Sequence, residues 1–122
     1  MHTLSPVNPQ AALAYDHVGI RVSNRQKSVH FYERLGFKET YRIAEGEANE
    51  MITAGGVRIN LIFNGAKITG QKNTLLDEPI KKPGITHPAF IINNINEFQA
   101  WLSKEGITIT EGPKKLGPRR IA

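Results

Sequence analysis

The chain has 122 residues, with 16 Lys and Arg against 11 Asp and Glu, a formal net charge of +5, and no Cys. A chain of this length forms one domain that folds without crosslinks. The absence of Cys excludes disulfides, thiolate metal sites and a catalytic thiol. Any metal must therefore be held by His, carboxylate, amide or water, which favours Mn, Fe, Ni, Co or Zn.

The positive charge points to small anionic ligands rather than to nucleic acid. The basic residues are scattered along the chain, apart from Lys81 and Lys82 and a cluster near the end that consists of Lys114, Lys115, Arg119 and Arg120. Basic and aromatic residues do not alternate as they do on a base-stacking surface. No apolar run approaches the roughly 18 residues of a membrane span. The polar start of the chain does not resemble a secretory signal, so we expect a cytoplasmic protein without nucleic-acid or membrane partners.

The chain divides into an arm and a single domain of two modules. Residues 1–14 read as a loose N-terminal arm, and residues 15–122 as the domain. Within the domain, module one spans 15–63, and a linker rich in Gly, Asn, Pro and Lys spans 64–84. Module two occupies the rest of the chain.

Module one shows the order β-α-β-β-β. An apolar, β-rich run predicts a strand at 15–22, and a helix follows at 25–35, capped by Ser23 or Asn24. Alternating apolar residues and the Gly-Gly turn between the last two runs predict three further strands, at 37–43, 48–54 and 57–63.

Module two repeats the beginning of module one. Its pattern predicts a strand at 85–92, a helix at 95–105 and a strand at 107–110. The spacing of module one places the next strands at about 118–124 and 127–133. The sequence thus ends inside the expected seventh strand, before the eighth. We interpret module two as truncated before its last strand, in preference to a natural short variant.

Two histidines occupy the same position in the two modules. His17 and His87 each lie near the start of an apolar run, and in each module a helical pattern closes at a Gly 19 residues further on, at Gly36 and Gly106. A pair of imidazoles in register is the pattern of a metal site between two modules. The alternative is that each ring is satisfied separately by a backbone carbonyl at the end of a strand.

The motifs around these histidines resemble those of the vicinal-oxygen-chelate superfamily. The first motif reads HVGIRV from His17 and SxxFYxxLGF from Ser28, and the second reads ITHPAF from Ile85. The superfamily includes glyoxalase I, fosfomycin-resistance transferases, bleomycin-binding proteins, methylmalonyl-CoA epimerases and extradiol dioxygenases. The resemblance covers about residues 14–122.

The resemblance implies an α+β fold of two βαβββ modules around a cleft with a divalent metal at its floor. His17 and His87 match the metal ligands of the first strand in each module. Asn60 stands where glyoxalase I has a ligand Glu on the fourth strand, so a four-ligand shell of that kind is not expected. The last ligand, a Glu of the eighth strand, would follow Ala122.

Arg58 and Asn60 are the expected substrate-binding residues. They share one face of the strand at 57–63, because side chains alternate along a strand. Arg58 suits an anionic group of the substrate, and Asn60 is either a substrate contact or a satisfied buried amide. The sequence names no general base, and four carboxylates are candidates by residue type only: Glu45, Glu47, Glu50 and Glu111.

Two functions remain open at this point. The first is a metal-dependent enzyme, of the lyase, isomerase, thiol transferase or dioxygenase type, that acts on a small and anionic oxygen-chelating substrate. The second is a metal-free protein that binds a drug or metabolite, as bleomycin-resistance proteins do. The presence of both histidines favours the enzyme. The resemblance also implies a homodimer, in some relatives with exchanged modules.

Overall fold

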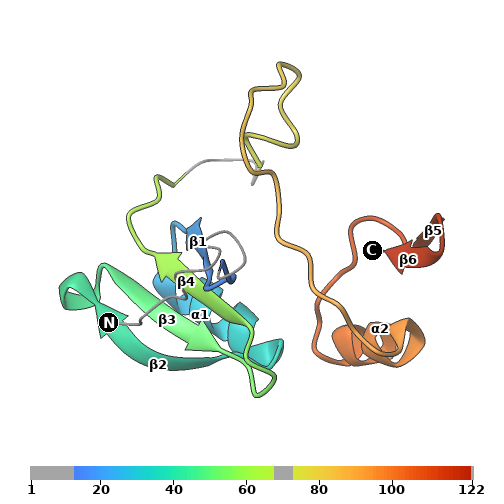
Figure 1. Cartoon of the computed structure of the whole chain (residues 1–122), viewed down its shortest axis with the longest axis horizontal. Coiled ribbons are helices and arrows are strands. Elements are labelled where there is room, and N and C mark those ends of the chain that lie inside the picture. Colours follow the sequence, from blue (N-terminus) through green and yellow to red (C-terminus); the bar gives the residue numbers. More distant parts are fainter. Residues whose placement is uncertain (1–12, 68–72, 122) are drawn as a thin grey trace, which may run out of the picture. The chain divides into compact units, whose positions relative to one another are not determined.

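The computed structural model of the chain describes residues 13–67 and 73–121 (Figure 1). The arm expected at 1–14 lies almost entirely outside these ranges. The chain forms two compact units, Met1–Lys82 and Pro83–Ala122, and each is described here by itself. Neither of the two α-helices in the described ranges is long and apolar enough to cross a membrane.

The first unit is a four-stranded sheet with one helix. The strand order is β1 (Val18–Arg21), β4 (Arg58–Ile62), β3 (Ala48–Ile52) and β2 (Lys38–Ile43). β1 runs parallel to β4, and the other neighbours are antiparallel. The parallel pair needs a connection that crosses the sheet, and helix α1 (Arg25–Arg34) begins it. This confirms the β-α-β-β-β order that the sequence predicts for module one.

Local capping fixes the start of α1. Asn24 has an extended backbone, and its side chain accepts a hydrogen bond from the backbone N–H of Lys27 at 3.0 Å. This satisfies one of the free N–H groups of the first turn, and it decides the choice between Ser23 and Asn24. Gly36 follows the helix with φ +99°, a conformation that favours glycine.

The core of the first unit lies between α1 and one face of the sheet. Its buried members are Phe37, Met51, Ile59 and Leu61, of which the last three have no exposed surface. The helix face that the sequence predicts to point inward packs against this cluster through Val29, Tyr32 and Leu35. The helix therefore covers one face of the sheet, and the residues of the opposite face are available for a site.

A partly buried polar network ties the start of α1 to the sheet. Arg25 donates two hydrogen bonds of 2.9 Å to the carboxylate of Glu39, and its guanidinium lies 4.9 Å from the centre of the Phe63 ring. Asn49, which has no exposed surface, donates to Glu39 at 2.6 Å and accepts from the backbone N–H of Leu61 at 2.9 Å. The hydrogen bonds from Arg25, and then that from Asn49, lower the pKa of Glu39 to about 2.

The second unit contains one helix and one hairpin. Helix α2 (Ile95–Lys104) is capped by Asn94, which accepts from the backbone N–H of Glu97 at 3.1 Å. Strands β5 (Lys114–Leu116) and β6 (Arg119–Ile121) pair with each other. The first unit also contains a short 3-10 turn, η2 (Ala44–Gly46), between β2 and β3. Together, the four-stranded sheet and the helices form the expected α+β fold.

Two strands predicted for module two are wrong. Residues 85–92 and 107–110 form no strand, whereas β6 lies within the strand expected at about 118–124. A strand requires a partner for its backbone hydrogen bonds. In the first unit β4 provides that partner for β1, but the only ladder among the described residues of the second unit joins β5 to β6. The apolar side chains of the first segment are accordingly exposed, with Ile85 at 78% and Ile91 at 89%.

Candidate functional site

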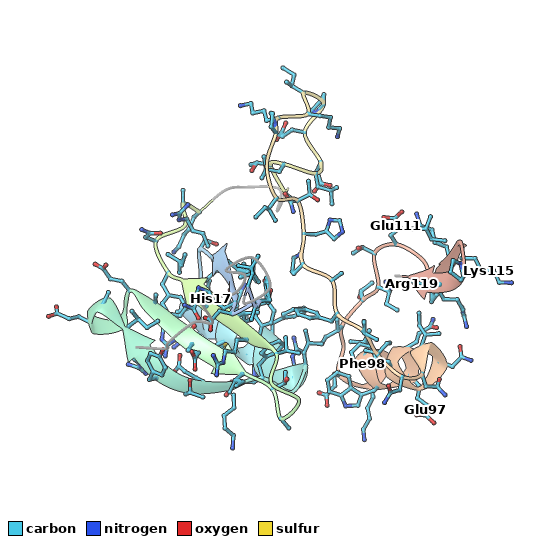
Figure 2. The ribbon with its side chains drawn as sticks, in the orientation of Figure 1. His17, Glu97, Phe98, Glu111, Lys115 and Arg119 are labelled. Carbon is cyan, nitrogen blue, oxygen red and sulfur yellow. The ribbon has the colours of Figure 1, made fainter. Side chains whose placement is uncertain are left out.

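The face of the sheet opposite α1, called here the open face, carries the site residues predicted for module one. Along β4, Ile59 points into the core, so Arg58 and Asn60 lie on the other side, as the period of two requires. β1 pairs Gly19 with Asn60, and the same offset places His17 beside Arg58. Figure 2 labels His17 on the first unit. Three of the four predicted site residues thus share one surface.

A carboxylate that the sequence reasoning missed connects His17 to Arg58. Nδ1 of His17 lies 2.6 Å from Oδ2 of Asp16, and Nη1 of Arg58 donates to Oδ1 of the same carboxylate at 3.1 Å. The hydrogen bond from His17, together with the charge of Arg58, lowers the pKa of Asp16. In the sequence, Asp16 stands directly before the histidine. This position indicates a contact with Arg58 only when the pairing of β1 with β4 is known.

The contact with Asp16 determines which imidazole nitrogen is available. An ionised carboxylate only accepts hydrogen bonds, so Nδ1 of His17 is the nitrogen that donates to Asp16, and in a neutral ring Nε2 then keeps its lone pair. A carboxylate that fixes a His ring in this way is the usual support of a metal-ligating imidazole. The side chain of His17 is 40% exposed.

His17 fits one position of a metal shell. His87, the second predicted metal ligand, lies in the other unit. Its Nδ1 is 2.8 Å from the hydroxyl of Thr86. The structure therefore leaves the pairing of His17 with His87 as a prediction. Within the ranges 13–67 and 73–121, no group of three or more His, Asp or Glu is arranged to hold a metal ion. The donors that fit are imidazole nitrogens, which suit Mn, Fe, Co, Ni and Zn.

Asn60 is not the satisfied buried amide that one reading of the sequence allowed. Its Oδ1 is buried and accepts no hydrogen bond from the described residues. Buried side-chain oxygens in proteins nearly always have a donor, and one without a donor calls for an explanation. The amide lies on the same face of β4 as Arg58, between Gly19 of β1 and the position of Glu50 on β3.

The four carboxylates proposed by residue type lie in different surroundings. Glu45 belongs to η2 and is exposed, as is Glu47 directly after it. Glu111 pairs with Lys114 in the second unit. Glu50 is half-buried on β3, on the same side of the sheet as Asn60. Of these four, Glu50 is the one that shares the open face with the predicted site.

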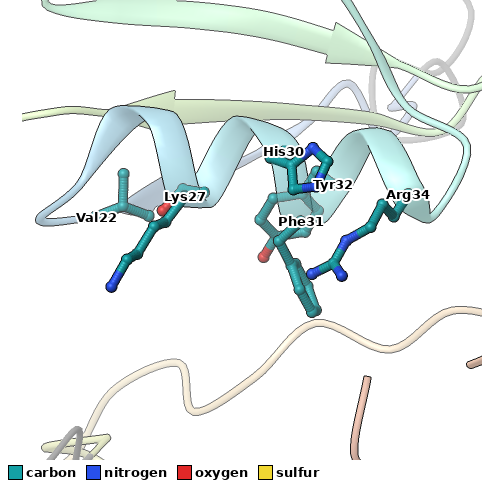
Figure 3. A pocket seen from close by; sticks show the side chains of 7 residues that line it. Val22, Lys27, His30, Phe31, Tyr32 and Arg34 are labelled. Carbon is teal, nitrogen blue, oxygen red and sulfur yellow. The ribbon is translucent and has the colours of Figure 1, made fainter. Parts of the chain in front are cut away.

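A separate hollow lies along α1 and is shown in Figure 3. Its polar lining includes Lys27, His30 and Arg34, and Phe31 contributes a ring that is 36% exposed. No carboxylate is among the residues that line it. Because α1 covers the other face of the sheet, this hollow is distinct from the open face and holds none of the predicted site residues.

Comparisons with known proteins agree with the architecture. A protein from the fungus Mycosarcoma maydis, the glyoxalase domain-containing protein RDO1, is 29% identical over 104 residues, which are 82% of this chain and 52% of that protein. The chain thus spans about half the length of the curated relative it matches.

Two solved structures share the fold. A glyoxalase/dioxygenase from Nostoc punctiforme superimposes with a TM-score of 0.66 at 20% identity, over 94% of this chain and 85% of that one. A glyoxalase family protein from Bacillus cereus superimposes with a TM-score of 0.59 at 19% identity, over 93% and 84%. At such identities the likeness concerns the fold alone.

The assignment to a family comes from the sequence as a whole. The model of the Glyoxalase/Bleomycin resistance protein/Dioxygenase superfamily matches residues 14–121, nearly the entire chain. The chain belongs to this superfamily.

Proposed function

We propose that this protein is a divalent-metal-dependent enzyme that acts on a small, anionic, oxygen-chelating molecule, with His17 and His87 among the metal ligands. The observation that carries the proposal is the imidazole of His17, which Asp16 fixes at 2.6 Å so that Nε2 stays free on an open face. A lyase, isomerase, thiol transferase or dioxygenase reaction is compatible with this site.

Each residue of the open face has a defined part in this proposal. A divalent ion would polarise adjacent oxygens of the substrate and stabilise the negative charge that develops on them. Asp16 keeps the proton of His17 on Nδ1, which preserves the ligand nitrogen. Asn60 supplies a neutral amide where a Glu would add a negative charge. The site therefore carries one negative charge fewer than a four-ligand shell that includes this Glu.

Arg58 supports the preference for an anionic substrate. One of its nitrogens donates to Asp16, and the guanidinium has five N–H donors in total. Its side chain is 44% exposed on the open face, so donors remain for a carboxylate or phosphate. A planar guanidinium binds both oxygens of such a group at once, which fixes the orientation of the ligand. The net charge of +5 adds a general attraction for anions.

A metal-free binding protein is the second candidate, and Arg58 is also the observation that favours it. A guanidinium beside His17 repels a cation and attracts an anion. In a metal-free protein, Arg58 would bind the anionic ligand directly. The two functions differ in one measurable property, the requirement for a divalent ion.

Calorimetric titration of the metal-stripped protein with Mn²⁺, Ni²⁺ and Zn²⁺ tests the choice. We expect one ion per site, and at least a tenfold loss of affinity in each of the variants His17→Ala and His87→Ala. His30→Ala is the matched control, since His30 is an exposed imidazole on α1, and it should bind as the unchanged protein does. Equal affinities in all four proteins, or no binding at all, would exclude the metal-dependent enzyme.

We also propose that the protein forms a homodimer. Among the described residues of the second unit, five large apolar side chains are exposed: Ile85 at 78%, Phe90 at 44%, Ile91 at 89%, Ile92 at 37% and Leu116 at 62%. Exposed apolar surface of this extent is typical of contact regions between chains. Light scattering during gel filtration should give the mass of two chains, and the mass of one chain would contradict the proposal.

A further inference from the structure

The carboxylate of Glu50 accepts hydrogen bonds from two hydroxyl groups of the neighbouring strand. β2 contains a bulge between Glu39 and Tyr41, so that Thr40 is an extra residue opposite β3. Oγ1 of Thr40 donates to one oxygen of the Glu50 carboxylate at 3.1 Å, and the phenol of Tyr41 donates to the other at 3.3 Å. Bulges often redirect side chains next to functional sites. Here the bulge brings both hydroxyls onto one carboxylate.

The strand register places Glu50 directly opposite Asn60. β3 and β4 pair Met51 with Ile59 and Ala48 with Ile62, and the position between these pairs is that of Glu50 and Asn60. Side chains in such opposite positions have Cβ atoms roughly 5 Å apart. On its other side Asn60 is flanked by Gly19, which has no side chain. The side chain of Ile62 approaches this glycine, with its Cδ1 3.4 Å from the position that a Cβ would take there.

Oδ1 of Asn60 and the carboxylate of Glu50 both accept hydrogen bonds, and neither can donate one to the other. Oδ1 of Asn60 is buried and accepts no hydrogen bond from the part of the chain that the structure describes, an arrangement that destabilises a folded protein. The carboxylate across from it accepts hydrogen bonds and cannot donate one to the amide oxygen. A structural role would be served better by an apolar residue at position 60. A ligand with an O–H or N–H group resolves the mismatch.

We propose that Glu50 and Asn60 form a subsite that binds a hydroxyl or amino group of the substrate. Arg58 lies two residues from Asn60 on the same face of β4, which corresponds to a separation of about 7 Å along the strand. The substrate then carries its anionic group at Arg58 and its hydrogen-bond donor at Glu50, as a short hydroxy acid or amino acid does. This inference rests on the anionic substrate of the proposed function.

Two small probes separate the subsite from general binding of anions. Glycerate has a carboxylate and two hydroxyls, whereas propionate has the carboxylate and no hydroxyl. We expect amide signals of β3 and β4 to shift in NMR titrations of the full chain, with glycerate bound roughly tenfold more tightly than propionate. That ratio is what about one ordinary hydrogen bond to a charged group contributes.

Variants assign this difference to its residues. Glu50→Gln should abolish the preference for glycerate and leave the affinity for propionate unchanged. Thr40→Val and Tyr41→Phe each remove one hydroxyl from the carboxylate and should reduce the preference partially. Glu33→Gln is the control, because Glu33 is an exposed carboxylate on α1, and it should retain the full preference. Circular dichroism verifies that each variant is folded.

The outcomes distinguish the subsite from the function on which it rests. Equal affinities for the two probes in the unchanged protein would overturn the subsite and leave the anion site at Arg58 intact. A preference for glycerate that persists in Glu50→Gln would overturn the role of Glu50. Binding of neither probe would overturn both the subsite and the anionic substrate.

Discussion

The two units of this chain begin with the same sequence pattern and reach different structures. Both have a histidine before an apolar run, and both continue into a helix capped by an Asn with nearly identical backbone angles, −139° and 106° at Asn24 and −141° and 108° at Asn94. The first unit then builds a sheet with a closed core. In the second, Leu102 is the buried residue of α2, and residues 85–92 form no strand. A capped helix depends on neighbours in sequence, whereas a strand depends on a distant partner.

The same difference separates the two histidines. His17 precedes β1, whose pairing with β4 brings Arg58 alongside and gives Asp16 two partners. His87 lies in a segment without a paired strand, and its ring contacts the adjacent Thr86. Each histidine thus contacts the residue directly before it, and what the sheet adds at His17 is the hydrogen bond from Arg58 to Asp16.

The largest expected effect is on the core of the first unit. Met51 has no exposed surface, and Met51→Ala should lower the free energy of unfolding by about 3 kcal/mol, because it removes buried contacts and leaves a cavity. Ile91→Ala, at a side chain that is 89% exposed, should change it by less than about 0.5 kcal/mol. Urea denaturation measures both. Similar losses in the two variants would show that residues 85–92 are buried as β1 is.

The polar network of the first unit should show a smaller effect, with a characteristic dependence on pH. Glu39→Gln should lower the free energy of unfolding by about 2 kcal/mol at neutral pH, since it removes the charge that Arg25 and Asn49 hold. The pKa of Glu39 is about 2, below the ordinary value of 4.5. Its contribution is thus complete above about pH 4.5 and is lost as the pH falls towards 2. Acid denaturation curves of the two proteins should converge in this interval, and parallel curves would contradict the network.

Asp16→Asn tests the orientation of the imidazole. We expect a loss of metal affinity of about tenfold, as is typical when a carboxylate that supports a metal-ligating His is removed. Nitrogen chemical shifts of the His17 ring should show its proton on Nδ1 in the unchanged protein and a mixture of tautomers in the variant. An unchanged ring spectrum would mean that Asp16 does not select the tautomer.

The smallest expected effect concerns Asn60. Asn60→Leu removes an acceptor without a partner, so thermal unfolding should give a stability within about 1 kcal/mol of the unchanged protein, or above it. The same variant should lose the preference for glycerate over propionate. A loss of stability well beyond that range would mean that the amide has a structural task in the folded protein.

Local patterns were sufficient for much of the fold. The alternation along β4 predicted that Arg58 and Asn60 share a face, and the Asn and Gly signals predicted both helices within one or two residues. The strand at 85–92 was wrong, because an apolar run does not reveal whether a partner strand is present. Asp16 was missed as a site residue, and Glu50 was a candidate by residue type only, because the contacts of both are made across strands and, for Glu50, at a bulge.

Paramagnetic broadening by Mn²⁺ tests the central claim, that the open face around His17 is the site at which a metal binds. In NMR spectra of the full chain, substoichiometric Mn²⁺ should broaden the amide signals of His17, Gly19 and Arg58 together with that of His87, and should spare α1. Broadening confined to exposed carboxylates such as Glu45 and Glu111, or at His87 without His17, would contradict the account.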